Sequence, residues 1–273
     1  MPGCEPILIL HEDRSVLAID KPCGWMLAPV SWRNTARNLR AAIESSIAAG
    51  DFWARSRGLK FLRYVHRLDA DTSGILLFAK SPGVVKTYSN LFESRQMDKT
   101  YLAVVRGNAP KGEWTCQLKL APDPKRVGRM IVDARRGKPA ETHFRLLETH
   151  GNYSLIEARP VTGRTHQIRV HLAEAGLPIV GDELYGKGSA TRAHQITSTQ
   201  LSAPSPWPSP PLIAGERVAE SRDRGHQKSN EYKKLLLGLR AVRLAYADPF
   251  TKKRVEIRAP AENFLKEFGF AEG

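Results

Sequence analysis

The sequence predicts an α+β fold: a mixed, mainly antiparallel sheet, bent into two halves, with flanking helices and a cleft across its middle. Two observations favour this fold. Short apolar runs follow one another at hairpin spacing, and few helical patterns lie between them. With 273 residues, the chain can form one large domain or two small ones, and it is long enough to bury a sizeable core.

The chain is strongly basic, with 42 Lys and Arg residues against 28 Asp and Glu and a formal net charge of +14. The basic residues are interleaved with apolar ones, so the charge belongs to the folded surface. This surface favours a polyanionic partner, nucleic acid ahead of an anionic membrane. Charge alone also fits a merely basic soluble protein.

Cysteine usage and the N-terminal residues predict a cytoplasmic protein. Cys4, Cys23 and Cys116 are far apart and form no Cys-x-x-Cys pair, which argues against a disulfide framework or a thiolate zinc site. Residues 1–10 are interrupted by Glu5 and contain no signal-peptide core. No stretch elsewhere is long enough to span a bilayer.

The chain is predicted to begin with two strands, at residues 7–10 and 16–19, joined by a polar turn. Residues 20–25 form a second turn, fixed by a proline and a glycine. Apolar residues on one face predict a helix at residues 33–49, which Gly50 ends. Residues 51–60 are predicted to be a basic loop.

The stretch at residues 64–80 places a charged loop directly before a strand. Residues 75–79 are an apolar run too short for a helix, so they predict a buried strand, and Gly74 permits a sharp turn into it. Asp69 and Asp71 are acids in an otherwise basic chain. Taken alone, Asp69 beside Arg67 also fits a solvated ion pair on a surface turn.

A helix is predicted at residues 84–96, followed by a polar turn that enters a strand within residues 98–107. Further strands are predicted at residues 115–120, 141–148 and 153–159. Residues 122–139 carry six Lys and Arg residues in a segment interrupted by Gly and Pro. This segment is either a phosphate-contacting arm or a solvated basic loop.

After residue 159, Thr165 is predicted to cap a helix that runs to about residue 175, with Ile168 and Leu172 on one face. Residues 189–230 are rich in Ser, Pro, Arg and Gln, and they predict a disordered, dispensable insertion. A hairpin at residues 240–258 and a short helix at 261–268 follow. Residues 1–188 and 231–273 are therefore expected to form a single domain.

Three motifs resemble the signatures of the RluA-type pseudouridine synthases, in order and in spacing. They are His-Arg-Leu-Asp-Ala-Asp-Thr-Ser-Gly at residues 66–74, Lys-Thr-Tyr-Leu-Ala-Val-Val-Arg-Gly at 99–107 and Gly-Arg-Thr-His-Gln-Ile-Arg-Val-His at 163–171. The resemblance covers nearly the whole chain apart from the insertion. It implies the pseudouridine synthase fold, with a central active cleft, and an isomerase that converts uridines in ribosomal or transfer RNA to pseudouridine. This isomerisation needs no cofactor, and we expect a monomer without a metal site.

The resemblance also assigns site residues. The family's essential aspartate corresponds to Asp69, its active-site tyrosine to Tyr101, and the arginine that pairs with the aspartate to Arg169. We expect Arg169 to bind Asp69 through a forked pair of hydrogen bonds. Predicted contacts to RNA or to the flipped base are Arg67, His66, Arg164 and Lys21. By residue type alone, Tyr101 fits equally well a core tyrosine with a satisfied hydroxyl.

The expected chemistry follows from the reaction. Cleaving a glycosidic bond builds positive charge at C1′, which Asp69 would stabilise or capture. Tyr101 would pack under the uracil, and its hydroxyl could accept the C2′ proton. His66, His166 and His171 are not accompanied by carboxylates or thiolates at ligand spacing, so they do not predict a metal site.

The chain departs from the family pattern at Asp20, where the family has Asn, and at Arg240 and Asp248, where the family has His. The departures at Arg240 and Asp248 put RNA contacts in doubt. No S4-type RNA-binding domain is expected before the first strand. Two alternatives stay open: a base-excising glycosylase, and a non-catalytic RNA-binding or RNA-folding module. The sequence does not indicate which RNA or which uridine is the target.

Overall fold

A computed structural model describes residues 7–27, 37–186 and 236–270. The described strands form one sheet in the order β1-β2-β4-β10-β5-β9-β8-β6-β7, with β3 paired to β4 and β11 paired to β10. Among these pairings only that of β4 with β10 is parallel. The predicted mixed, mainly antiparallel sheet is therefore confirmed. The predicted insertion at residues 189–230 lies outside the described residues.

The strands are β1 (Ile9–Glu12), β2 (Val16–Lys21), β3 (Arg63–Tyr64), β4 (Ser73–Ala79), β5 (Asp98–Arg106), β6 (Glu113–Pro122), β7 (Met130–Val132), β8 (Lys138–His150), β9 (Tyr153–Pro160), β10 (Leu239–Ala247) and β11 (Arg254–Arg258). The helices are α1 (Leu39–Ala48), α2 (Phe52–Arg55), α3 (Pro82–Glu93), α4 (Gln167–Glu174) and α5 (Glu262–Glu267). In the parts of the chain that the structure describes, no helix combines the length and the apolar character needed to cross a membrane.

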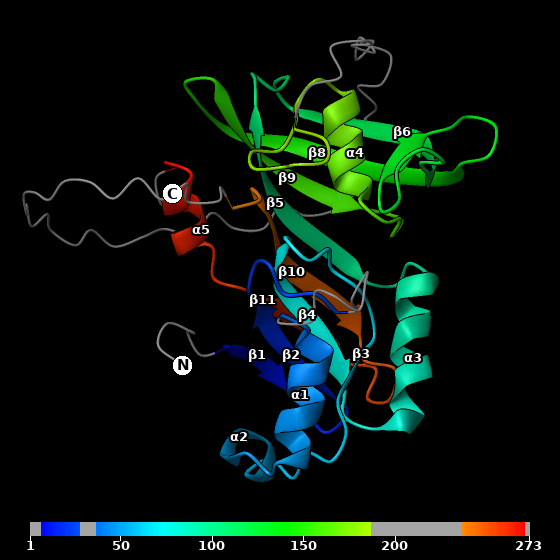
Figure 1. Cartoon of the computed structure of the whole chain (residues 1–273), viewed down its shortest axis with the longest axis vertical. Helices are drawn as coiled ribbons and strands as arrows, with labels where there is room; N and C mark the ends of the chain where they lie inside the picture. Colours follow the sequence, from blue (N-terminus) through cyan, green and yellow to red (C-terminus); the bar gives the residue numbers. More distant parts are fainter. Residues whose placement is uncertain (1–6, 28–36, 187–235, 271–273) are drawn as a thin grey trace, which may run out of the picture.

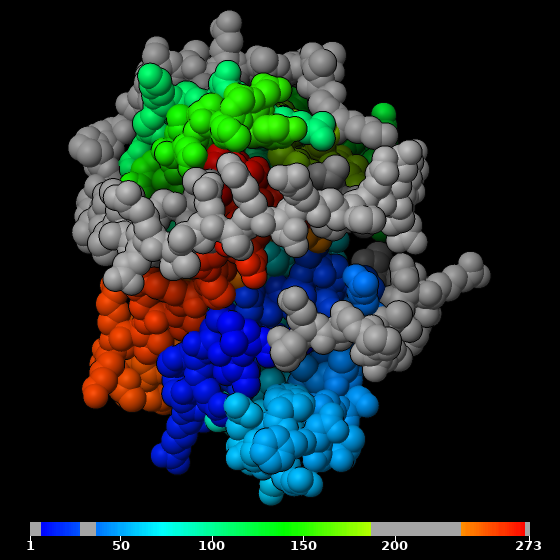
Figure 2. Space-filling view, turned by 90° about the vertical axis from the view of Figure 1, so that its left-hand side faces the viewer, coloured from blue at the N-terminus to red at the C-terminus, as the bar shows by residue number. Residues whose placement is uncertain are grey.

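The sheet is bent into two halves that meet where β5 lies beside β10 (Figure 1). The lower half contains β1 to β4, β10 and β11, and the upper half contains β6 to β9. In Figure 2 the N-terminal segments, in blue, and β10 with β11, in orange, share the lower half, while β6 to β9, in green, form the upper half. The C-terminal strands thus complete the half that the N-terminal strands begin.

The lower half buries both faces of β4, because alternate side chains of a strand point to opposite sides. Ile75 and Leu77 pack in one core cluster with Tyr88 of α3. Leu76 and Phe78 pack in another cluster with α1. Residues 75–79 therefore form the predicted buried strand, because helices cover both of its faces.

In the upper half, α4 lies across the face of the sheet (Figure 1). Ile168 and Leu172 share one face of α4, as predicted, and they pack with Phe144 of β8 and Ile156 of β9. This contact fixes the position of α4, and with it the position of Arg169.

Three local predictions are wrong. Residues 51–60 are not all loop, since α2 forms one helical turn within them. Residues 122–139 include the strand β7. Thr165 does not cap α4: His166 holds the N-cap position, in the left-handed region with a φ of 55°, and makes no side-chain cap.

Candidate active site

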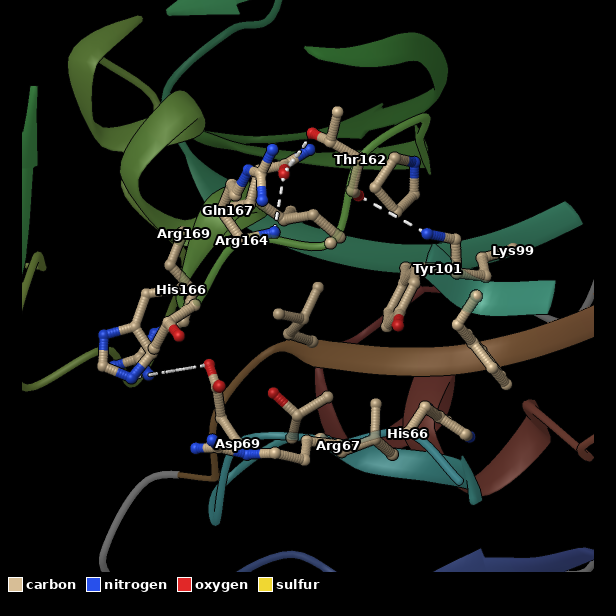
Figure 3. A pocket seen from close by; sticks show the side chains of 18 of the residues that line it. His66, Arg67, Asp69, Lys99, Tyr101, Thr162, Arg164, His166, Gln167 and Arg169 are labelled. Atoms are coloured by element: carbon tan, nitrogen blue, oxygen red, sulfur yellow. Dashed lines mark hydrogen bonds and ion pairs between the residues drawn. The ribbon is translucent and has the colours of Figure 1, made fainter. Parts of the chain in front are cut away.

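A cleft of about 550 Å³ lies between the two halves (Figure 3). Ligand sites typically enclose roughly 300–1,000 Å³. Residues of the segment before β4 form one wall, residues 160–169 form the other, and β5 contributes Lys99 and Tyr101. The charged lining residues are five basic and two acidic side chains: Arg67, Arg95, Lys99, Arg164, Arg169, Asp69 and Glu93. This cationic lining suits a polyanionic ligand.

Asp69 lies in the loop between β3 and β4, where a short turn joins the Asp69 carbonyl to the Thr72 N–H at 3.2 Å. The loop can enter β4 only through a glycine. Gly74 has a φ of +106°, and a Cβ there would lie 2.1 Å from the carbonyl oxygen of Ala241 on β10. The close parallel contact of β4 with β10 therefore fixes one end of the Asp69 loop.

Lys21 holds the same loop from inside the protein. Its side chain is fully buried, and Nζ donates to the carbonyl of Ala70 at 2.8 Å and to that of Pro22 at 3.0 Å. Burial lowers the pKa of Lys21 to about 8. The predicted contact of Lys21 with RNA is wrong, because a buried amine that binds two backbone carbonyls cannot reach an external ligand.

Arg169 brings two carboxylates together. Its Nη1 donates to Oδ2 of Asp69 at 3.1 Å, so the predicted pair exists across 100 residues of sequence. The forked pair of bonds, however, goes to Asp182: Nε to Oδ2 at 2.8 Å and Nη2 to Oδ1 at 2.9 Å. The predicted fork on Asp69 is wrong, because the Nε/Nη2 edge of the guanidinium faces Asp182 and only Nη1 donates to Asp69.

Arg169 and Asp182 stabilise each other in their charged forms, and Asp69 also stabilises the charge of Arg169. Burial alone would raise the pKa of Asp182, but hydrogen bonds from Arg169 and from the N–H groups of Tyr185 and Leu184 hold it below its usual value. Burial opposes the charge of Arg169 as well, yet the hydrogen bond and charge of Asp182, followed by those of Asp69, raise its pKa. Arg169 is therefore a fixed cation.

Tyr101 lies on β5, and its hydroxyl points into the cleft (Figure 3). Burial, followed by the negative charge of Asp69, raises the pKa of Tyr101 well above its usual value. The phenol therefore stays protonated at neutral pH. This argues against the predicted role as acceptor of the C2′ proton and favours the predicted packing role.

The side chains of His66 and Arg67 differ in their exposure and in their contacts with the rest of the protein. His66 Nε2 accepts the Leu77 N–H at 3.1 Å, and its ring stacks on Phe92 with centroids 4.3 Å apart. Burial, followed by the positive charge of Lys99, lowers the pKa of His66 to about 3, so the ring is neutral. Arg67 is exposed at the cleft wall. Of the two, Arg67 is the side chain with freedom to meet a ligand.

Arg164 lines the opposite wall. Its Nε donates to the carbonyl of Pro139 at 3.1 Å, and its backbone N–H donates to Gln167 Oε1 at 3.0 Å. Gln167 also accepts from the Thr162 hydroxyl at 2.6 Å. These bonds hold Arg164 at the rim, consistent with the predicted RNA contact.

Sequence reasoning missed Asp182, Lys99 and the role of His166. His166 Nε2 lies 3.8 Å from Asp69 Oδ2, and its Nδ1 lies 2.9 Å from the Tyr185 hydroxyl. Lys99 lines the cleft next to Tyr101, and burial followed by the charge of Arg95 lowers its pKa to about 8. Lys99 and His166 lie inside recognised motifs, and Asp182 follows one of them. Their positions in the sequence could therefore have indicated that they belong to the site.

The segment at residues 122–139, here called the basic arm, contacts Tyr185 beside Arg169. The Tyr185 hydroxyl accepts the Met130 N–H at 2.8 Å, and the Arg129 guanidinium lies 5.8 Å from the centre of the Tyr185 ring. The same ring faces the guanidinium of Arg169 at 5.2 Å. Lys125 and Arg126, farther along the arm, are exposed. The arm therefore continues the cationic surface outward from the site.

Two departures from the family pattern, Arg240 and Asp248, are buried and bind inside the protein. Arg240 Nε donates to the carbonyl of Pro260 at 2.9 Å. Asp248 accepts from the Tyr88 hydroxyl at 2.5 Å. They are structural residues of the lower half, so the expectation that they alter direct RNA contacts is not supported. Within the described ranges, no group of three or more His, Cys, Asp or Glu side chains is arranged to hold a metal ion.

Comparison with known proteins identifies the family. Residues 15–174 match the model of the RNA pseudouridylate synthases. The chain therefore belongs to this family, which confirms the resemblance of its three motifs.

Relatives with curated names agree. The chain is 35% identical over 189 residues to ribosomal large subunit pseudouridine synthase D of Borreliella burgdorferi, covering 68% of this chain and 56% of that protein. It is 37% identical over 196 residues to ribosomal large subunit pseudouridine synthase C of Escherichia coli K12, covering 71% and 58%. The chain thus spans little more than half the length of these relatives.

Among solved structures, human RNA pseudouridylate synthase domain containing 1 is similar with a TM-score of 0.65 and 22% identity, covering 98% of this chain and 89% of that one. At this identity the likeness shows a shared fold. It supports the α+β architecture predicted from the strand spacing.

Proposed function

We propose that this chain is an RNA pseudouridine synthase, an isomerase that moves uracil from an N1 to a C5 linkage on particular uridines. The observation that carries the proposal is Asp69, which receives one hydrogen bond from Arg169 at the wall of a cationic cleft. Membership of the family supports it.

The reaction needs a carboxylate at this place. Breaking the bond between C1′ and N1 leaves positive charge at C1′, and Asp69 stabilises that charge or captures C1′. The uracil then turns, C5 bonds to C1′, the C5 proton is lost to solvent and N1 gains a proton. No electrons are exchanged with another molecule, so the step balances without a redox partner.

Two further residues act on the base. Tyr101 offers its ring to the uracil, and its protonated hydroxyl can donate a hydrogen bond but is a poor proton acceptor. Exposed Arg67, two residues before Asp69, fills the space left in the RNA when the uridine is flipped out of its stack. Arg164 and the basic arm contact phosphates farther along the RNA.

The names of the relatives favour ribosomal RNA as the first substrate to test, with transfer RNA second. The proposal includes a monomeric, cytoplasmic enzyme that requires no cofactor.

The test compares Asp69→Asn with the parent protein. The substrate is total RNA labelled with [5-³H]uridine, from cells in which the gene for this chain is deleted. We expect tritium release to fall to background while filter binding of the RNA is nearly unchanged, since affinity comes from many phosphate contacts. Asp71→Asn, two residues along the loop, serves as the matched control and should keep the parental rate.

Other outcomes distinguish the alternatives. Release of free uracil by the parent protein would indicate a base-excising glycosylase. Tritium release at the parental rate by Asp69→Asn would show that Asp69 is not the catalytic carboxylate. A cellular role that survives Asp69→Ala would indicate an RNA-binding or RNA-folding module.

A further inference from the structure

Asp182 competes with Asp69 for one guanidinium. Two N–H groups of Arg169 face Asp182 at 2.8 and 2.9 Å, and one faces Asp69 Oδ2 at 3.1 Å. The Asp182 side chain is completely buried, whereas that of Asp69 is 23% exposed. The stronger, forked pair is thus made on the side away from the cleft.

The backbone holds Asp182 in place. Its Oδ1 accepts the N–H groups of Leu184 and Tyr185, each at 3.0 Å. Its carbonyl accepts the N–H of Gly186 at 2.8 Å, and a Cβ at Gly186 would lie 2.2 Å from that carbonyl oxygen. Because this turn is closely packed, Asp182 cannot follow Arg169 if the guanidinium moves.

We propose that Asp182 is a positioning residue that limits Arg169 to one hydrogen bond with Asp69, so that Asp69 Oδ1 stays free to meet C1′. The inference rests on the proposed function. An arginine beside a single carboxylate tends to bind both of its oxygens. With Asp182 present, the Nε/Nη2 edge is occupied and the guanidinium is held in an orientation that offers Asp69 one bond from Nη1, so two carboxylates share one cation. One net negative charge is therefore left for the cationic transition state.

The direct test is Asp182→Asn. Asparagine keeps Oδ1 as acceptor for the two backbone N–H groups, so the turn is retained, but its NH₂ group faces the Arg169 Nε–H and breaks the fork. With [5-³H]uridine-labelled total RNA from cells lacking the gene, we expect kcat to fall about a hundredfold, the scale of a misplaced catalytic group. We expect KM to stay within about twofold, because RNA contacts are untouched.

Asp13→Asn is the matched control. Asp13 Oδ1 also accepts two backbone N–H groups, from Ser15 at 2.7 Å and Val16 at 2.8 Å, in the β1–β2 turn and outside the cleft lining. This variant should keep the parental kcat and KM. Equal losses in both variants would attribute the effect to turn stability and overturn the proposal.

A second measurement does not depend on activity. In a crystal structure of Asp182→Asn, we expect the Arg169 guanidinium to bind both oxygens of Asp69. An unmoved guanidinium together with parental kcat would overturn the proposal. Should Asp182→Asn not fold, Arg169→Lys asks the same question, because an amine cannot make the fork. A parental kcat in that variant would show that the fork is not needed.

The two proposals fail separately. If the parent protein releases no tritium, the proposed function fails, while the crystal structure still reports whether Asp182 restrains Arg169. If the parent is active and Asp182→Asn matches it, only the role of Asp182 fails.

Discussion

Asp20 of β2 and Arg240 of β10 are bonded to each other, with Arg240 Nη2 2.5 Å from Asp20 Oδ2, although 220 residues separate them in the chain. Arg240 Nη1 also donates to the Ser73 hydroxyl at 3.2 Å, at the start of β4. On the sequence, these two residues were separate departures from the family pattern. In the structure they are one pair that joins three strands below the Asp69 loop.

Breaking this pair should destabilise the protein. We expect Asp20→Asn or Arg240→His to lower the free energy of unfolding by about 2–3 kcal/mol each, because each leaves a largely buried charge without its partner. The double variant restores the two family residues and should lose less than the sum of the single losses. Urea unfolding of the four proteins measures this coupling, and strict additivity would contradict it.

Gly74→Ala should be strongly destabilising. The added Cβ would lie 2.1 Å from Ala241 O at a positive φ, so β4 and β10 must separate, at a loss of at least about 3 kcal/mol. Gly83→Ala, in α3, is the control: nothing lies within 4 Å of its Cβ position, and alanine favours the helix by about 0.5–1 kcal/mol. Thermal unfolding of both variants checks the prediction, and similar melting temperatures would argue against the close strand contact.

Stability should fall in mild acid because of His171. This side chain is fully buried, and neither ring nitrogen has a hydrogen-bond partner among the described residues. Burial lowers its pKa from 6.5 to about 4. Between these values the unfolded chain binds a proton that the folded protein excludes, so the free energy of unfolding drops by about 1.4 kcal/mol per pH unit as pH falls from 6.5 to 4.

Replacing His171 by Leu removes this titration. We expect the difference in unfolding free energy between His171→Leu and the parent to change by about 2 kcal/mol, in favour of the variant, between pH 7.5 and pH 5. Urea unfolding at the two pH values measures it. His150→Gln, at an exposed position, is the control. Parallel pH profiles for His171→Leu and the parent would refute the assignment.

The basic arm should contribute affinity rather than rate. We expect Lys125→Gln with Arg126→Gln to weaken RNA binding and to reduce the slope of log K against log salt by about one to two, because up to two phosphate contacts are lost. The rate at saturating RNA should stay unchanged. Arg55→Gln with Lys60→Gln removes the same charge on and just after α2, which lies at the opposite end of the molecule (Figure 1). Equal salt slopes for the two double variants would contradict a specific role for the arm.

The sequence predicted the strands and the core helices well, because these depend on local patterns. The apolar run at Ile75 and the one-faced pattern around Leu39 are both satisfied by burial in the structure. The one-turn helix α2 was missed because four residues carry too little periodicity. Thr165 looked like a cap by residue type, yet the chain enters α4 through His166 in a left-handed conformation.

The site was predictable only where a motif named its residues. The resemblance predicted that Asp69 and Arg169 are paired. Which carboxylate receives the forked pair of hydrogen bonds depends on the direction in which the Nε/Nη2 edge of Arg169 faces. No local pattern around Asp182 reveals that direction. Lys21 was predicted to contact RNA, and only the fold brings the carbonyl of Ala70 to its amine.

The position of β10 also decides when the proposed site can form during synthesis of the chain. β10 is made after most of the chain, yet it lies between β4 and β5 and supplies the backbone against which Ser73 and Gly74 are set. A nascent chain that stops before Leu239 lacks the strand that joins the two halves, so its cleft has walls that are not connected. Assembly of the proposed site therefore requires β10 and follows its synthesis.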